Sequence, residues 1–223
     1  MASGHNVEKH YYEYRALLTL QELYPQEYGS FKHGDKPDLY DDGKDMGIEV
    51  VRGVDIQFEK HSSFFQKHLQ GQMIDEIPKF KVEWFKTYGY TILTKGDLGL
   101  EPAKEIIAYH PEASWINTGN LERALRQKIE YIETTDWRVS QLSLYVFSDF
   151  FKMYEREDIE NLVCFAKELQ ANNKKKYSLL FIDDCGWFYR CDLTTGEISF
   201  WNTDDALHNI CVKAKACAEG FNL

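Results

Sequence analysis

"KPDLYDDGKDMGIEVVRG", residues 36–53, places an Asp directly after a Pro, then a polar turn, then a Glu inside an apolar run. Two strand-like segments separated by the polar residues 41–45 predict an antiparallel hairpin. Side chains alternate between the two faces of a strand, so Glu49 points away from the face of Ile48 and Val50. Because burying a lone carboxylate is costly, Glu49 needs a partner.

The nearest acidic partner in this hairpin is Asp38, eleven residues before Glu49. A hairpin of that length can bring the two carboxylates side by side, where they repel each other unless a cation lies between them. The pair therefore predicts a site for Mg²⁺ or Mn²⁺. In an equally weighted alternative, Asp38 is a turn residue and Glu49 forms a salt bridge with a neighbouring Lys or Arg.

A third acid, Glu13, lies in a segment with helical periodicity, residues 7–24, which Pro25 ends. Glu13 precedes Leu17, Leu20 and Tyr24 by four, seven and eleven residues, which places it on the apolar face. An acid on that face, upstream of two further unexplained acids, is a candidate site residue. The alternative is an ordinary Glu at the rim of the apolar stripe.

The rest of the chain alternates helical and strand-like segments, and this pattern predicts one α/β domain over residues 1–223. We expect a core at about residues 7–150 and a C-terminal hairpin and helix in residues 151–223. The expected helices are residues 57–88, bent near Gly71 or Pro78, and residues 119–133, 155–170 and 204–221. The expected strands beyond the first hairpin are residues 90–95, 142–150, 177–184, 186–193 and 197–201.

Composition narrows the class of protein. The apolar fraction of 43% is too high for a disordered chain, and the net charge of −10 argues against a general nucleic-acid coat protein. No apolar run is long enough to span a membrane and the polar N-terminus is no signal peptide, so we expect a cytoplasmic protein. The five cysteines form no CxxC pair and are interpreted as structural thiols.

The sequence has a Glu in the first helix, then a Pro-Asp pair, a polar turn and a Glu in a strand. This order resembles the PD-(D/E)xK nuclease superfamily, and the resemblance covers about residues 7–95. The resemblance implies a restriction-endonuclease-like core, a mixed central sheet flanked by helices, here with additional C-terminal strands and helices. It also implies that Asp38 and Glu49 are catalytic, and that both bind the metal together with Glu13.

The resemblance fails at one position. The superfamily has a Lys two residues after this Glu, whereas the sequence has Val51, which cannot orient a water or offset negative charge. The following segment offers Lys60, Gln66 and Lys67, and we expect Gln66 or Lys67 to take the catalytic role. Lys60 and Lys67 are also the expected contacts to a nucleic acid.

Three functions stay open. The first is a metal-dependent nuclease that hydrolyses phosphodiester bonds in DNA in preference to RNA. It would have no membrane partner, and a homodimer is one assembly that stays open. The second is a degenerate nuclease fold that serves as a nucleic-acid-binding or assembly module, which Val51 and the acidic net charge favour. The third is an unrelated enzyme or regulatory α/β domain in which Glu49 is structural.

Overall fold

The chain, which the sequence predicts to be one α/β domain, divides into two compact units. The main unit consists of Met1–Gly53 and Thr118–Leu223, and the inserted unit is Val54–Asn117. Each unit has its own hydrophobic core, which is the physical reason for the division. The computed structural model describes residues 4–53, 64–65, 69, 71–87, 90–109, 118–148, 154–184 and 186–220.

A seven-stranded mixed sheet, with the strand order β1-β2-β3-β6-β7-β8-β9, forms the centre of the main unit. The central strands β3, β6 and β7 are parallel, and the strands on both sides of them are antiparallel. This sheet confirms the predicted α/β class with additional C-terminal strands. In chain order the strands are β1 (Lys32–His33), β2 (Leu39–Asp41), β3 (Met46–Arg52), β6 (Gln141–Phe147), β7 (Tyr177–Asp183), β8 (Trp187–Asp192) and β9 (Ile198–Asn202).

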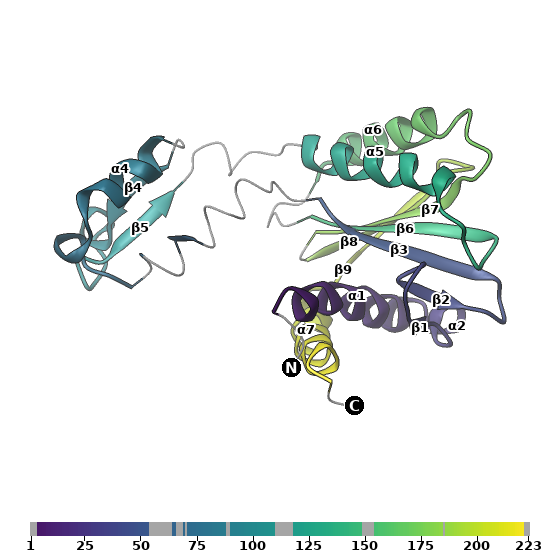
Figure 1. Ribbon diagram of the computed structural model, residues 1–223, viewed down its shortest axis with the longest axis horizontal. Helices are drawn as coiled ribbons and strands as arrows, with labels where there is room; N and C mark the ends of the chain where they lie inside the picture. Colours follow the sequence, from purple (N-terminus) through teal and green to yellow (C-terminus); the bar gives the residue numbers. More distant parts are fainter. Residues whose placement is uncertain are drawn as a thin grey trace. The chain divides into compact units, whose positions relative to one another are not determined.

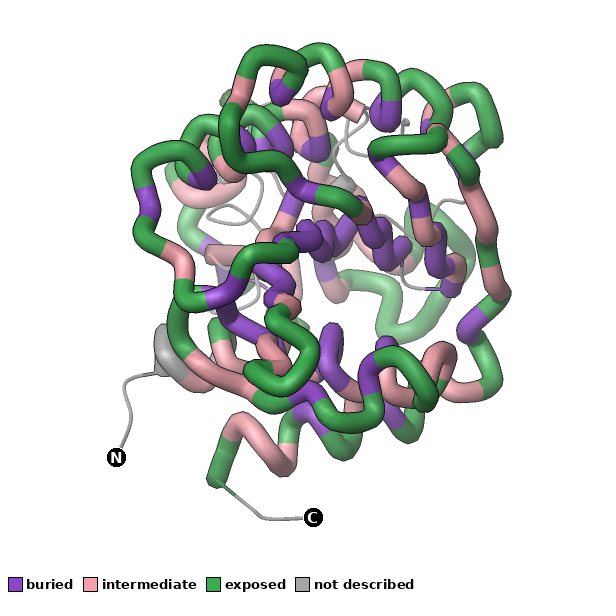
Figure 2. Tube along the Cα trace, turned by 90° about the vertical axis from the view of Figure 1, so that its right-hand side faces the viewer, coloured by how far each residue is buried: buried purple, intermediate pink, exposed green. Residues whose placement is uncertain are grey.

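Helices cover both faces of this sheet (Figure 1). The pair α5 and α6 lies on one face, α1 lies on the other, and α7 packs against α1. Buried residues gather along the strands between these two helical layers (Figure 2). The helices of the main unit are α1 (Gly4–Leu23), α2 (Pro25–Tyr28), α5 (Gly119–Thr134), α6 (Arg156–Leu169) and α7 (Asp204–Ala218).

The core between α1 and the sheet is rich in aromatic side chains. Leu17 and Leu20 of α1 pack there with Ile48 of β3, as the apolar stripe of the helix predicts. Tyr145 and Phe181 from the central strands complete the same cluster. Because α1 rests on β3 through these contacts, the side chains at its start are held close to the β2–β3 hairpin.

The turn between β2 and β3 is fixed by its own acids. Asp41 accepts hydrogen bonds from the backbone N–H groups of Gly43 and Lys44, at 2.9 and 3.3 Å. Asp45 has a left-handed backbone (φ 55°) and accepts a hydrogen bond from the N–H of Ser140 at 2.9 Å. These contacts set the hairpin register and attach the turn to the start of β6.

The inserted unit departs from the sequence prediction in two ways. Residues 57–88 do not form one helix, because Gly71 has a positive φ and Met73 is extended within the described part of this range. The strand β5 was not expected, and it pairs with β4 in an antiparallel sheet of two strands. The described elements of this unit are η1 (Ile74–Glu76), α4 (Lys79–Thr87), β4 (Thr91–Thr94), η2 (Lys95–Leu98) and β5 (Ile106–Tyr109).

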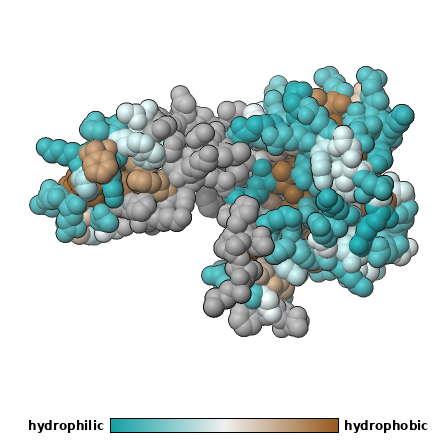
Figure 3. Space-filling view, in the orientation of Figure 1, coloured by the Kyte–Doolittle hydropathy of each residue, from teal (hydrophilic) through white to brown (hydrophobic). Residues whose placement is uncertain are grey.

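Apolar side chains reach the surface of the inserted unit (Figure 3). Phe80 is 70% exposed, and Leu98 and Leu100 are each more than half exposed. The buried core of this unit is small and centres on Phe85. No described helix of either unit combines the length and the apolar composition that crossing a membrane requires.

The point where the chain leaves the main unit is closely packed. The N–H of Gly53 donates a hydrogen bond of 2.7 Å to the carbonyl of Phe147, which extends the pairing of β3 with β6. A Cβ atom at Gly53 would come within 2.4 Å of the side chain of Leu121, near the start of α5. The chain therefore exits beside the helix at which it returns.

Candidate functional site

Asp38 and Glu49 come together at the start of the β2–β3 hairpin. Leu39 pairs with Ile48, and continuing that register by one residue places Asp38 opposite Glu49. Asp38 lies just before β2, and its Oδ2 accepts a hydrogen bond of 2.8 Å from the N–H of Val50. Both acids are buried, with exposed fractions of 6% and 4%. The structure thus brings together the two acids that the hairpin spacing paired.

Glu13 reaches the same region from α1. Its side chain is buried, as its position on the apolar face of the helix predicts. Lys9, one helical turn earlier, connects it with the hairpin: Nζ lies 3.2 Å from Oε1 of Glu13 and 3.7 Å from Oδ1 of Asp38. The ammonium group of Lys9 therefore bridges α1 and the hairpin by contacting an acid of each.

The three acids influence one another electrostatically. Burial, together with the charges of Glu49 and Glu13, raises the pKa of Asp38 to about 7, against the lowering effect of the hydrogen bond from Val50. Burial also acts to raise the pKa of Glu13, but hydrogen bonds from His33 and His10 outweigh it and lower that pKa to about 2. The charged form of Asp38 is therefore disfavoured first by burial and then by the neighbouring acids, and a nearby cation would favour it.

A lysine that sequence reasoning missed completes the group. Lys128 of α5 lies with its Nζ 2.6 Å from Oε2 of Glu49, and its side chain is about one-fifth exposed. Its helix buries Leu121, Ala124 and Ile132, and Lys128 follows Ala124 and precedes Ile132 by four residues each. A charged residue within the apolar stripe of a helix is the signal that singled out Glu13, and it could have found Lys128 as well.

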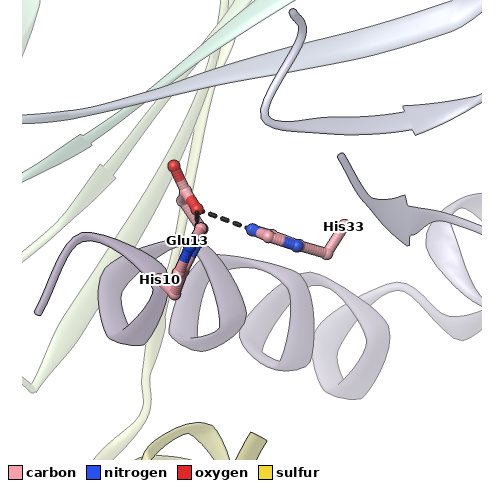
Figure 4. A group of neighbouring side chains, drawn as sticks. All are labelled: His10, Glu13 and His33. Carbon is pink, nitrogen blue, oxygen red and sulfur yellow. Dashed lines mark hydrogen bonds and ion pairs between the residues drawn. The ribbon is translucent and has the colours of Figure 1, made fainter. Parts of the chain in front are cut away.

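The other oxygen of Glu13 belongs to a histidine cluster (Figure 4). Oε2 lies 2.9 Å from Nδ1 of His10 and 2.6 Å from Nε2 of His33. His10 stands on the same helix, three residues before Glu13, and His33 comes from β1. Sequence reasoning did not single out either histidine as a site residue.

The residues expected to replace the missing lysine lie outside the described part of the chain. These are Lys60, Gln66 and Lys67, which belong to the inserted unit. Their expected catalytic and nucleic-acid-binding roles stay predictions. Within the described residues, Lys128 is the lysine that contacts Glu49.

The acids and the lysine of the main unit offer chemical groups of different types. Carboxylate oxygens are the ligands that Mg²⁺ and Mn²⁺ prefer, and Glu13, Asp38 and Glu49 supply them from three elements. Burial is the main cause of the raised pKa of Asp38, and the charges of Glu49 and Glu13 add to it. Lys128 can also orient a water or face developing negative charge, which Val51 cannot do.

Comparisons of this chain with protein-family models, with curated proteins and with solved structures gave no significant match.

Proposed function

We propose that this protein is a metal-dependent nuclease that hydrolyses phosphodiester bonds, with DNA preferred over RNA. Glu13, Asp38 and Glu49 are the proposed ligands of Mg²⁺ or Mn²⁺, and Lys128 is the proposed water-orienting group. The observation that carries this proposal is that α1, the β2–β3 hairpin and α5 bring three buried acids together with two lysines, Lys9 and Lys128.

The order of elements supports the same proposal. In the main unit α1 and the four-residue helix α2 are followed by the antiparallel strands β1, β2 and β3, then by α5 and by β6, which is parallel to β3. The resemblance to the PD-(D/E)xK superfamily implies this α-β-β-β-α-β order, with acids at the positions of Glu13, Asp38 and Glu49. The inserted unit stands between the third strand and the second helix.

The three acids and Lys128 have different roles in the proposed reaction. A divalent ion bound by the acids would supply a water of lowered pKa and a Lewis acid at the phosphate. Lys128 holds Glu49 in place and can donate a hydrogen bond to the attacking water. Its positive charge also offsets the negative charge that grows on the phosphate oxygens in the transition state. A lysine from α5 thereby takes the place of the one missing at Val51.

A second candidate is a degenerate nuclease fold that binds nucleic acid without cutting it. Val51 and the net charge of −10 favour it. The ion pair between Lys128 and Glu49 is also compatible with it, because a structural salt bridge would have the same geometry. In this account Lys60 and Lys67 are the proposed nucleic-acid contacts.

The test is incubation with linear, circular and single-stranded DNA and with RNA, in Mg²⁺, Mn²⁺ or EDTA. We expect cleavage with a metal, none with EDTA, and none by Glu49→Gln. Glu130→Gln removes an exposed acid of α5 and is the matched control, which should cut like the wild type.

Two results would decide against the nuclease. One is cleavage that persists in Glu49→Gln, which would assign the activity to another site or to a contaminant. The other is a wild type that cuts no substrate and shows, by calorimetry, no Mg²⁺ or Mn²⁺ binding that Glu49→Gln removes. The binding module then takes its place.

A further inference from the structure

Glu13 faces two different groups of partners with its two carboxylate oxygens. Oε1 lies on the side of Lys9, which also contacts Asp38. Oε2 lies on the side of His10 and His33 and is within hydrogen-bonding distance of both rings. The acids and the histidines therefore form two groups that share one residue.

The second group has the composition of a transition-metal site. Two imidazole nitrogens and one carboxylate oxygen lie within 4.8 Å of one another. Imidazole nitrogen suits Zn²⁺, Co²⁺ and related ions, whereas Mg²⁺ prefers oxygen ligands only. We infer that His10, Glu13 and His33 bind a divalent transition-metal ion of this class, at a site chemically distinct from the acids around Asp38.

The spacing of the three atoms is close to what such an ion requires. Metal–ligand distances of about 2.0–2.1 Å in a tetrahedral site put neighbouring ligand atoms about 3.3 Å apart. The nitrogens of His10 and His33 lie 2.9 and 2.6 Å from Oε2, so these separations must grow by about 0.4 and about 0.7 Å. Side-chain rotation supplies a shift of that size. Three protein ligands also leave one position for a water.

The ring of His33 is held in its orientation before any ion binds. Its backbone pairs with Leu39 in the sheet, so the side chain is directed towards α1 (Figure 4). The ring stacks on Tyr14, with centroids 4.5 Å apart, and meets the edge of His10 at 5.0 Å. Such fixed ligands lose little conformational freedom on binding, which favours affinity.

His10 gives the ion a route from solvent. Its side chain is 40% exposed, whereas those of His33 and Glu13 are 18% and 3% exposed. The cluster is therefore open on one side and closed around the carboxylate on the other. A metal site needs such an entry path as well as its ligands.

The competing explanation is that the cluster only ties β1 to α1 through hydrogen bonds. In that case each ring needs no more than an N–H group directed at Glu13. Replacing each histidine by glutamine separates the two explanations, because the glutamine amide can donate the same hydrogen bond but lacks the imidazole nitrogen that binds the metal.

The probe is Co²⁺, whose visible absorption reports on ligand type and geometry, titrated into the full-length protein. We expect one Co²⁺ per chain, displaced by Zn²⁺ and retained in excess Mg²⁺. His10→Gln and His33→Gln should each weaken binding at least about 100-fold, since losing even an outer partner of a ligand costs roughly 10–100-fold. Their Tm values without metal should stay close to that of the wild type.

Two further variants sharpen the test. His208→Gln alters an exposed histidine of α7 and should bind Co²⁺ like the wild type. Glu49→Gln should also keep the Co²⁺ site, so this result is independent of whether the protein is a nuclease. The inference is overturned if the wild type binds no Co²⁺, if both histidine variants bind it unchanged, or if Mg²⁺ displaces it as readily as Zn²⁺ does.

Discussion

The main unit contains two groups of buried acids that are neutralised differently. At the end of β7, Asp183 accepts a hydrogen bond of 2.7 Å from Nη2 of Arg15 and one of 2.8 Å from the hydroxyl of Tyr145. Both members of this ion pair are buried. At the β2–β3 hairpin, by contrast, three acids meet cations that extend towards solvent, and the side chain of Lys9 is 57% exposed.

The difference separates a buried ion pair from the acids that we propose as metal ligands. In the Arg15–Asp183 pair the side chains of both partners are almost fully buried, so an incoming cation has little access to the carboxylate. Around Asp38, the exposed Lys9 can move aside and leave the oxygens to a metal. The acids of both groups are buried, and the two groups differ in how exposed the basic partners of these acids are.

The largest effect is expected from Lys128→Met, which keeps the length of the side chain and removes its charge. Positioned proton-transfer groups contribute about 10²–10⁴-fold, so the rate of cleavage should fall by that factor. Mn²⁺ binding should persist, because the three acids remain. Single-turnover cleavage in saturating Mn²⁺ measures the first quantity, and calorimetry measures the second.

The control for this loss is Lys213→Met, which removes an exposed lysine of α7. Adding Val51→Lys to Lys128→Met places a lysine two residues after Glu49, on the same face of β3, and should restore part of the rate. An unchanged rate in Lys128→Met would show that this lysine is only a structural partner of Glu49.

A smaller effect, on stability, is expected from Asp183→Asn. This change leaves the Arg15 charge buried without its counter-charge, which costs about 3–5 kcal/mol of unfolding free energy. The Tm should fall by roughly 10 °C, measured by thermal unfolding without metal.

Asp38→Asn measures how much the acids at the β2–β3 hairpin contribute to stability. It removes one of three neighbouring acids and keeps an oxygen that can accept the hydrogen bond from Val50. The metal-free Tm should therefore stay level or rise, by on the order of 1 kcal/mol in unfolding free energy. A loss as large as that of Asp183→Asn would mean that both acid groups are structural.

The smallest effect concerns Asp184, a buried neighbour of Asp183 that forms no ion pair with a Lys or Arg among the described residues. Burial and the charge of Asp183 raise the pKa of Asp184 to about 8. The folded protein then holds this proton between about pH 4 and pH 8 while the unfolded chain has released it, so stability falls as the pH rises through that window.

Asp184→Asn removes the titrating group and should flatten this slope, raising the Tm at pH 8 by more than at pH 5. Asp205→Asn, at an exposed acid of α7, should keep the wild-type slope. Thermal unfolding at both pH values is the measurement, and equal slopes in the wild type and Asp184→Asn would contradict the assignment.

The sequence predicted the parts of the site that local patterns determine. Hairpin spacing paired Asp38 with Glu49, and helical spacing placed Glu13 on a buried face. Lys128 was missed because it meets Glu49 through tertiary packing across a separation of 79 residues. His33 was missed because it meets Glu13 through tertiary packing between β1 and α1, across a separation of 20 residues.

The inserted unit was the least predictable part of the fold. A helix over residues 57–88 was expected from composition, yet Gly71 and the extended Met73 interrupt it. β5 has only four residues, and it is identified as a strand by its pairing with β4 rather than by its own sequence pattern. The existence of a second unit follows from which apolar residues share a core, and a single sequence does not show that.

The close packing of Gly53 against Leu121 has a consequence for how this protein can evolve. Because the chain leaves and re-enters the main unit at neighbouring points, the length of the intervening segment costs little in loop-closure entropy. Insertions and exchanges of whole modules are tolerated best at such junctions. Evolution can therefore replace residues 54–117 by a different module while Glu49 and Lys128, on opposite sides of the junction, keep their contact.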